Sequence, residues 1–221
     1  PISAAPPARE LLFPLLTKQT TIGVANVSGS STTATIRVYG TAGTELATAA
    51  TQAIPANGIL SVNLATLFPS VNFDTTKASI RVAATANIAG TSIISDFPVA
   101  PSWVVVNGVD TSLSQFDLFF PHVPTGPTDA SPAWQSVLGV TNLSPTSQNV
   151  TFTFTPGTGS ATSVTRSIAA NGILREDVHT LFGFSPAYRD GWVKVSGSGP
   201  LTAFVAYGFT GSGGAAVVPA L

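Results

Sequence analysis

The sequence predicts an all-β protein with two tandem immunoglobulin-like or jelly-roll-like β-sandwich domains that arose by internal duplication. Three observations lead to this fold class. Short segments alternate apolar and polar residues, as strands with one buried face do. Turns rich in glycine, proline, serine and asparagine separate these segments at intervals of roughly 8–12 residues, a spacing typical of sandwiches. The same order of segments occurs twice, most plainly in the string NGIL at residues 57–60 and 171–174.

The repeat sets the expected domain boundaries. Residues 78–108 align with residues 191–221 without a gap, and the second copy carries an insertion that starts at Pro124. We expect four parts in chain order: an N-terminal arm (1–10), a first β-sandwich repeat (11–108), a linker (109–116) and a second β-sandwich repeat (117–221).

Alternation places the strands within each copy. The pattern is strictest at residues 150–155, and it recurs at 35–39 and 192–196 with the charged side chain on the polar face. Valine and threonine are frequent in these segments, because branching at Cβ suits a pleated strand. Seven or eight strands are expected in each copy, and no long helical periodicity is present. Turns are expected at residues 28–30, 40–43, 156–159 and 197–200.

The repeated string predicts a local folding device. Asn-Gly supports a backbone with positive φ and marks a tight reversal between two strands. Asn63 and Asp177 hold equivalent positions farther along, and each side chain is expected to cap a single helical turn. The Leu-Phe pairs that follow, at residues 67–68 and 181–182, are expected to plug the open end of each sandwich.

Composition excludes several classes of function. Lys+Arg number 9 and Asp+Glu number 10, so the net charge of −1 offers no basic surface to nucleic acid or anionic lipid. No apolar run approaches the roughly 18 residues that span a membrane. Only 9% of the residues are charged, so electrostatic repulsion opposes self-association weakly.

Two further properties bear on location. The chain has no cysteine, so no disulfide framework contributes, and it does not begin with methionine. Removal of a secretory signal peptide would account for this N-terminus, so we expect a secreted protein, extracellular or at the cell surface. The alternatives are a trimmed expression product and a proteolytic fragment.

The densest cluster of functional side chains is Arg175-Glu176-Asp177-Val178-His179. Its counterpart in the first copy, residues 61–65, lacks these groups, and a zinc site would need further ligands that are not nearby in sequence. The other histidine, His122, aligns with Leu15 and is expected to pack. No nucleophile elbow is present. We therefore expect no catalytic, cofactor or metal site, and no enzyme.

Tryptophan provides the candidate contact surface. Trp134 follows the proline-rich insertion and could stack on a sugar ring, or it could anchor its own loop. Trp192 starts an alternating strand, where burial is expected, and Trp103 precedes the last strand of the first copy. Three asparagines match the N-glycosylation triplet, a pattern that arises easily in so Thr/Ser-rich a chain: Asn26, Asn142 and Asn149.

These motifs resemble tandem β-sandwich repeats of uncharacterised secreted and cell-surface proteins of bacteria. The resemblance rests on an aromatic-proline pair (13–14 and 120–121), an apolar strand that ends in asparagine (Asn26 and Asn142), and a G-W-x-x-V strand at residues 191–195. The first copy departs by having serine at position 79 in place of the tryptophan. The resemblance implies an exported module without enzymatic activity.

We expect a non-enzymatic extracellular structural protein, a self-assembling subunit of a filament, surface layer or adhesive stalk. The arm could add as a strand to a neighbour's sheet edge, giving a homo-oligomer or polymer, or it could pack on its own domain. The alternative function is a secreted carbohydrate- or ligand-binding β-sandwich module, with a glycan as partner.

Overall fold

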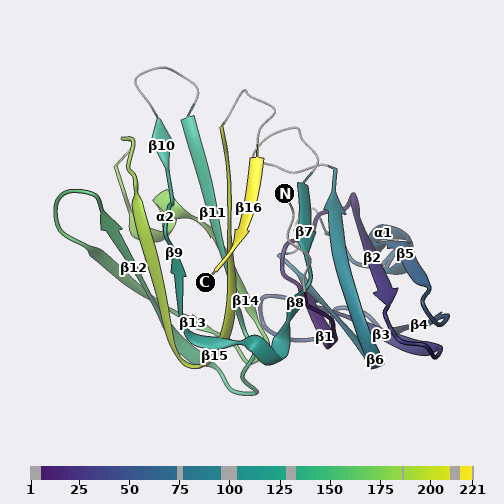
Figure 1. Ribbon diagram of the computed structural model, residues 1–221. Helices are drawn as coiled ribbons and strands as arrows, with labels where there is room; N and C mark the ends of the chain where they lie inside the picture. Colours follow the sequence, from purple (N-terminus) through teal and green to yellow (C-terminus); the bar gives the residue numbers. More distant parts are fainter. Residues whose placement is uncertain are drawn as a thin grey trace.

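A computed structural model describes residues 6–73, 77–95, 104–127, 133–185, 187–209 and 215–220. The predicted all-β class is confirmed, because 61% of the chain is strand and 6% is helix. Two sheets lie side by side, one formed by each half of the chain (Figure 1). This is the arrangement of a β-sandwich protein.

Eight strands in the described part of the chain form the first sheet: β1 (Ala8–Phe13), β2 (Thr20–Asn26), β3 (Thr32–Tyr39), β4 (Ala50–Ile54), β5 (Ile59–Asn63), β6 (Ser79–Ile94), β7 (Val104–Asn107) and β8 (Val109–Asp110). Eight more form the second sheet: β9 (Gln115–Phe120), β10 (Gly126–Pro127), β11 (Ala133–Asn142), β12 (Gln148–Pro156), β13 (Thr162–Ile168), β14 (Ile173–Asp177), β15 (Gly191–Phe209) and β16 (Ala215–Pro219). Short helices follow β5, β8 and β14: α1 (Leu64–Leu67), the 3-10 turn η1 (Thr111–Leu113) and α2 (Val178–Phe182).

The two sheets repeat the same pairings in the same chain order. In the first half, β6 pairs with β1, β2, β3 and β7, β2 pairs with β5, and β3 pairs with β4. In the second half, β15 pairs with β9, β11, β12 and β16, β11 pairs with β14, and β12 pairs with β13. We call two residues counterparts when they hold the same place in this pattern.

Each sheet bends around a core of its own, because its long strand contributes to two layers. The beginning of β15 pairs with β9 and β12, and its end pairs with β11 and β16. The buried side chains of β12, among them Phe152 and Phe154, face those of β11 across this core. The polar side chains between them lie outside, where Thr151 and Thr153 hydrogen-bond to residues of β13. The predicted alternation at residues 150–155 is therefore confirmed.

The glycine-rich stretch at residues 197–200 is a bend inside β15, and the prediction of a turn between two strands was wrong here. The register shifts between Ser196 and Leu201, where the strand passes from one layer to the other. A Cβ on Gly197 would lie 2.6 Å from Oε1 of Gln148. Glycine is needed because the bend brings the backbone against this side chain.

The NGIL turns adopt the predicted conformation, with φ of 54° at Asn57 and 56° at Asn171. A buried asparagine holds each turn in place. The Asn26 amide donates to the carbonyl oxygens of Ile54 (3.3 Å) and Pro55 (2.9 Å).

Asn142 does the same in the second half, donating to Ile168 (3.2 Å) and Ala169 (2.9 Å). The amide nitrogens of Asn26 and Asn142 are thus engaged inside the fold, whereas Asn149 is exposed.

The predicted helix caps are confirmed. Oδ1 of Asn63 accepts a hydrogen bond from the backbone nitrogen of Thr66, and Asp177 caps α2 through Thr180, both at 3.2 Å. The residues at the ends of these turns, Phe68 in the first half and Phe182 in the second, lie in the two cores as expected.

Parts of the expected arm and of the expected linker are strands. Residues 8–10 belong to β1, which pairs with β6 of its own sheet, and Ala8 is buried there. Val109 and Asp110 of the expected linker form β8 against β1, and Gln115 begins β9. The apolar side chains of β1 fill the first core, so this segment stays in its own sheet. Residues 1–5 of the arm lie outside the described residues.

Candidate interaction surfaces

The two halves share an apolar interface. Leu15, Ile94 and Val104 of the first half pack with Phe204 and Ala206 of the second half. The end of β15 is therefore buried on both sides, since Ala203 and Val205, which alternate with these two, lie in the core of the second half. This double burial explains the nearly continuous apolar run in β15.

Backbones of the two halves also touch. A Cβ on Gly43 would overlap the carbonyl oxygen of Ala170, and one on Gly172 would lie 2.5 Å from the carbonyl oxygen of Thr41. Nη1 of Arg175 donates to the carbonyl oxygen of Leu16 at 3.3 Å, and burial lowers the pKa of this guanidinium. The hairpin after β3 thus packs on the NGIL turn of the second half.

A cleft of about 560 Å³ runs beside this interface, between β7 with η1 and the strands β15 and β16. Its described lining is mostly aliphatic, with Asp110 as the only ionisable side chain. That carboxylate accepts a hydrogen bond from the backbone nitrogen of Ser112 at 2.9 Å and caps η1. Among the described residues that line the cleft, no two groups are paired for acid–base or nucleophilic chemistry.

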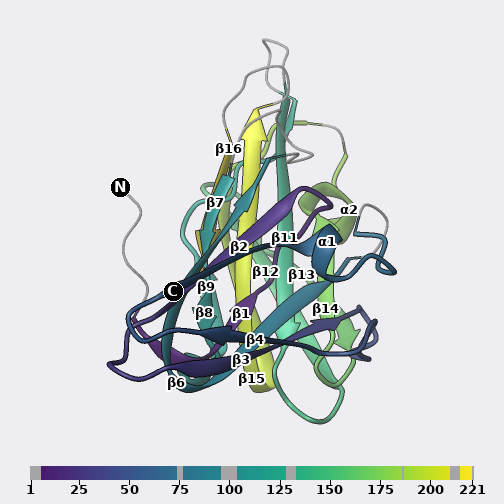
Figure 2. The ribbon, with the colours of Figure 1, turned by 90° about the vertical axis from the view of Figure 1, so that its right-hand side faces the viewer.

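The first half has an uncovered sheet face. Ile173 and Ala206, on the covered face of the second half, are 2% and 0% exposed. Their counterparts Ile59 and Ile93 are 71% and 37% exposed, and Val105 beside Ile93 is 38% exposed. We call the side of β2, β5, β6 and β7 that carries Ile59, Ile93 and Val105 the open face. Figure 2 looks at the molecule from the side of the first half, with β2 and β6 in front of the second sheet.

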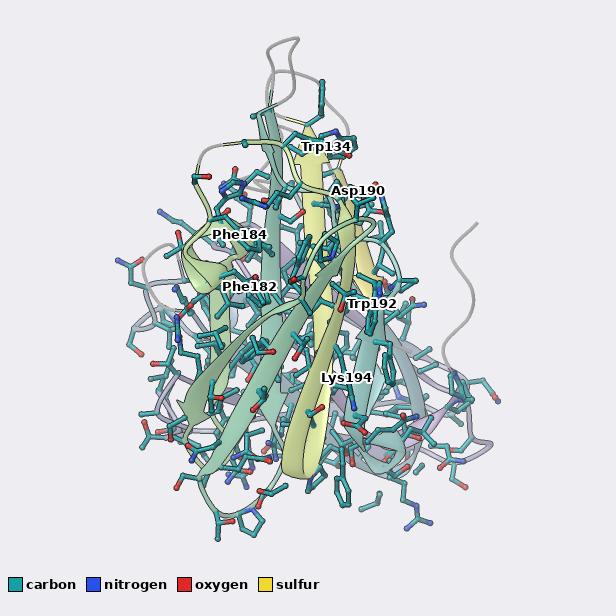
Figure 3. All side chains as sticks on the ribbon, turned by 90° about the vertical axis from the view of Figure 1, so that its left-hand side faces the viewer. Trp134, Phe182, Phe184, Asp190, Trp192 and Lys194 are labelled. Carbon is teal, nitrogen blue, oxygen red and sulfur yellow. The ribbon has the colours of Figure 1, made fainter. Side chains whose placement is uncertain are left out.

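The second half has an exposed aromatic surface, formed by Phe119 of β9 and Trp192 of β15. Their ring centroids lie 6.3 Å apart, and the residues are 41% and 39% exposed. Their counterparts in the first half, Leu12 and Ser79, are both fully buried. The expected burial of Trp192 was wrong, because it is the outer side of this strand that remains uncovered. Trp192 and Lys194 follow each other down this side of the second half (Figure 3).

Charges beside the aromatic surface neutralise each other. Nζ of Lys194 lies 3.2 Å from Oδ2 of Asp117 and 5.6 Å from the centroid of the Phe119 ring. A hydrogen bond from Ser196, and next one from Lys194, lowers the pKa of the Asp117 carboxyl.

Trp134 lies at the start of β11, above Trp192 in Figure 3. Its ring contacts Phe209 at 4.9 Å and Tyr207 at 6.0 Å between centroids, and it is half-buried. Trp134 thus packs on its own sheet while keeping part of its surface accessible. Trp103 lies outside the described residues.

His122 is not the buried packing residue that its alignment with leucine predicted. Its side chain is 56% exposed, and Nε2 lies 3.1 Å from Oδ1 of Asp190. Both partners are exposed, so this pair lies at the surface.

The cluster at residues 175–179 does not converge on one point. Arg175 faces the first half, Glu176 lies 3.6 Å from Arg166, and Asp177 caps α2. The ring of His179 packs edge-on against Phe184. Within the described ranges, no group of three or more His, Cys, Asp or Glu side chains is placed to hold a metal ion. None of the helices described is long and apolar enough to cross a membrane.

Sequence reasoning overlooked Ile59 and Phe119, because alternation marks a side chain as outward or inward and says nothing of what covers the outer side. One signal was available in the comparison of the copies. An aromatic residue stands at positions 119 and 192 where the first copy has leucine and serine.

Comparisons with known proteins were made at three levels. No known protein family matches the sequence, and no curated protein matches it. Among solved structures, the Thermotoga maritima protein 1070 is 11% identical, over 49% of this chain and 95% of that chain, with a TM-score of 0.43. A Bacteroides uniformis β-glucuronidase is 12% identical, over 95% of this chain and 25% of that chain, with a TM-score of 0.21. An anti-sigma factor domain-containing protein is 10% identical, over 95% and 82%, with a TM-score of 0.17. These TM-scores are too low to assign a family or a function.

Proposed function

We propose that this chain is a non-catalytic structural subunit that self-associates into a polymer, as in a filament, surface layer or adhesive stalk outside the cell. In this proposal each half is a complete immunoglobulin-like or jelly-roll-like sandwich, and the two arose by duplication. The shared pairing pattern supports the duplication, as do Asn26 and Asn142, which hold the same turn in the two halves.

The open face is the observation that carries the proposal. Its counterpart in the second half is buried by the other half of the same chain, so this type of sheet face is built to be covered. In the first half, Ile59, Ile93 and Val105 remain exposed on one side of one sheet. Exposed apolar side chains on one sheet face mark interaction sites, and a net charge of −1 does little to keep copies apart.

Light scattering across a concentration series, with electron microscopy of the same samples, tests this proposal. Wild-type protein is expected to grow in mass with concentration, and Ile59→Lys is expected to remain monomeric. Phe116→Lys is the matched control, because Phe116 is 58% exposed and belongs to neither surface. A wild-type chain that stays monomeric at every concentration would refute self-association.

The exposed aromatic pair favours a second candidate function, carbohydrate binding. Phe119 and Trp192 present two rings on a sheet face, beside the hydroxyl of Ser196 and the Asp117 carboxylate. Sugar rings stack on such aromatic faces, and flanking polar groups hydrogen-bond to their hydroxyls. A glycan array with Trp192→Ala and Trp134→Ala tests this candidate. Binding that either variant abolishes would support it, and an array without any signal would reject it.

A further inference from the structure

We infer that copies of this chain join head to tail, and that the contact between copies repeats the contact between the two halves of one copy. The aromatic surface of one copy lies on the open face of the next. This inference rests on the proposed function, because it names the partner of the open face.

Within one chain, the first half covers the second at two places. Leu15 and Ile94 pack against Phe204 in the shared apolar interface. The hairpin that contains Gly43 meets the NGIL turn of the second half at Ala170, with no space between the two backbones. The first half therefore uses one end of its sandwich and one hairpin to cover the second half.

Two counterparts of these covering residues are accessible in the second half, whereas Tyr207, the counterpart of Ile94, packs against Trp134. His122 replaces Leu15 and has a 56% exposed side chain. Gly159 replaces Gly43, and both have positive φ, 99° and 72°. A Cβ on Gly159 would meet only Pro156 of its own hairpin, at 4.0 Å. At His122 and Gly159, the second half thus presents accessible counterparts of the residues with which the first half covers it.

The counterparts of the covered residues are free in the first half. Ala56 replaces Ala170 and is exposed, and Ile59 replaces the buried Ile173. The three atoms nearest to a Cβ on Gly58 would all belong to Pro55 in its own turn. The NGIL turn and the open face beside it are therefore left without the cover that the second half receives.

The side chains of the aromatic surface and those of the open face of the next chain are complementary in size. Within one chain, Phe204 lies in the interface between the halves, and Leu12 and Ser79 on the outer side of the first half are fully buried. The open face has Thr91 at the position of Phe204. Phe119 and Trp192, which are larger and exposed, stand at the counterpart positions in the second half. The larger aromatic surface would occupy the room that threonine leaves on the open face.

Electrostatics allows the same contact. The outward residues of the open face, including Ala25, Ile59, Thr91, Ile93 and Val105, are uncharged. On the aromatic surface, Lys194 already pairs with Asp117. Bringing the surfaces together buries no unpaired charge, which would be the costly event.

The two surfaces face opposite ways. Figure 2 views the first half, with β2 and β6 in front, and Figure 3 views the other side of the molecule, with Trp192 and Lys194 toward the viewer. A contact between two different surfaces on opposite sides does not close into a symmetric dimer. It is heterologous, so repeating it generates an open chain of copies, or a ring where the rotation between copies closes.

A mixing experiment tests this geometry. Ile59→Lys blocks the open face and leaves the aromatic surface intact, whereas Trp192→Lys does the reverse. Each variant alone is expected to have the mass of one chain, and an equimolar mixture is expected to have the mass of two. If wild-type protein polymerises but the mixture of the two variants stays monomeric, the head-to-tail contact is overturned while the proposed function stands. A glycan that binds Phe119 and Trp192 without affecting wild-type polymerisation would also overturn it.

Engineered cysteines give a second measurement, since the chain contains none. Ala56→Cys combined with Thr158→Cys places thiols on the free NGIL turn and on the free hairpin tip. Under oxidation or a short bis-maleimide, the double variant is expected to form a ladder of covalent dimers, trimers and larger species. Each single variant is expected to stop at dimers. The pair Ala42→Cys and Ala170→Cys is the positive control, because the equivalent contact inside one chain should link without an increase in mass. The contact would be refuted if the control pair links while the double variant polymerises without forming a covalent ladder.

Discussion

Gly139→Ala should destabilise this protein much more than the matched substitution Gly23→Ala. The two glycines are counterparts on β11 and β2, and each faces one residue of the long strand. A Cβ on Gly139 would overlap the ring of Phe204, and even the third-nearest ring atom, Cδ1, would be 2.8 Å away. A Cβ on Gly23 would meet Thr91 at an ordinary 3.9 Å.

The expected loss of stability follows from the movement that the Phe204 ring would have to make. Relieving the overlap moves Phe204 out of the interface between the halves, and overpacking of this kind costs about 1–3 kcal/mol. Removing a buried phenylalanine altogether costs about 3–5 kcal/mol, which sets an upper limit. We expect about 2–3 kcal/mol for Gly139→Ala, or roughly 4–12 °C in Tm for a chain of this length. Gly23→Ala should change stability by less than about 1 kcal/mol, and in the stabilising direction.

Scanning calorimetry and urea unfolding of both variants provide the measurement. A third and a fourth variant isolate the cause: Gly139→Ala should cost almost nothing in a Phe204→Thr background, which reproduces the arrangement at Thr91. Equal losses of Tm for Gly139→Ala and Gly23→Ala would refute the reasoning, as would a cost that persists after the phenylalanine is removed.

Three further predictions concern local features. Asn142→Ala should lower the free energy of unfolding by about 2–4 kcal/mol in urea titrations, because it leaves buried backbone groups unpaired, whereas exposed Asn149→Ala should stay within about 0.5 kcal/mol. Asp177→Ala should cost about 1 kcal/mol by removing the cap of α2; an unchanged urea midpoint would contradict that role. The pKa of Asp117 is lowered in the folded protein, so its contribution to stability is present above the ordinary aspartate pKa and is lost as the pH falls below it. In an NMR titration, Ser196→Ala should raise the pKa of Asp117, and an unchanged pKa would exclude that hydrogen bond as the main cause.

Much of the local structure could be predicted from the sequence because it depends on neighbours in the chain. Alternation at residues 150–155 predicts that Phe152 lies on the buried face of its strand, whichever element packs against that face. Asn63 and Asp177 each cap a turn three residues away. The bend at residues 197–200 was misread, because a glycine-rich stretch looks the same whether it ends a strand or lets one strand cross between layers.

The candidate surfaces could be predicted only in part. Trp134 was singled out by its place after the insertion, and the structure leaves it half-buried against Tyr207 and Phe209. Trp192 lies on the outward side of its alternating strand. It is 39% exposed because the first half does not cover that side.

The sequence by itself determined the fold class, the repeat, and the identity of the residues that turn and cap each half. These depend on periodicity and on hydrogen bonds over a few residues, which both copies carry. Only the tertiary structure decided which of two counterpart faces is covered. Ile59 and Ile173 lie in the same string, NGIL, yet one is 71% exposed and the other 2%. The difference arises because the first half packs on the face that carries Ile173, whereas no part of the chain that the structure describes packs on the face that carries Ile59. No local pattern encodes this arrangement.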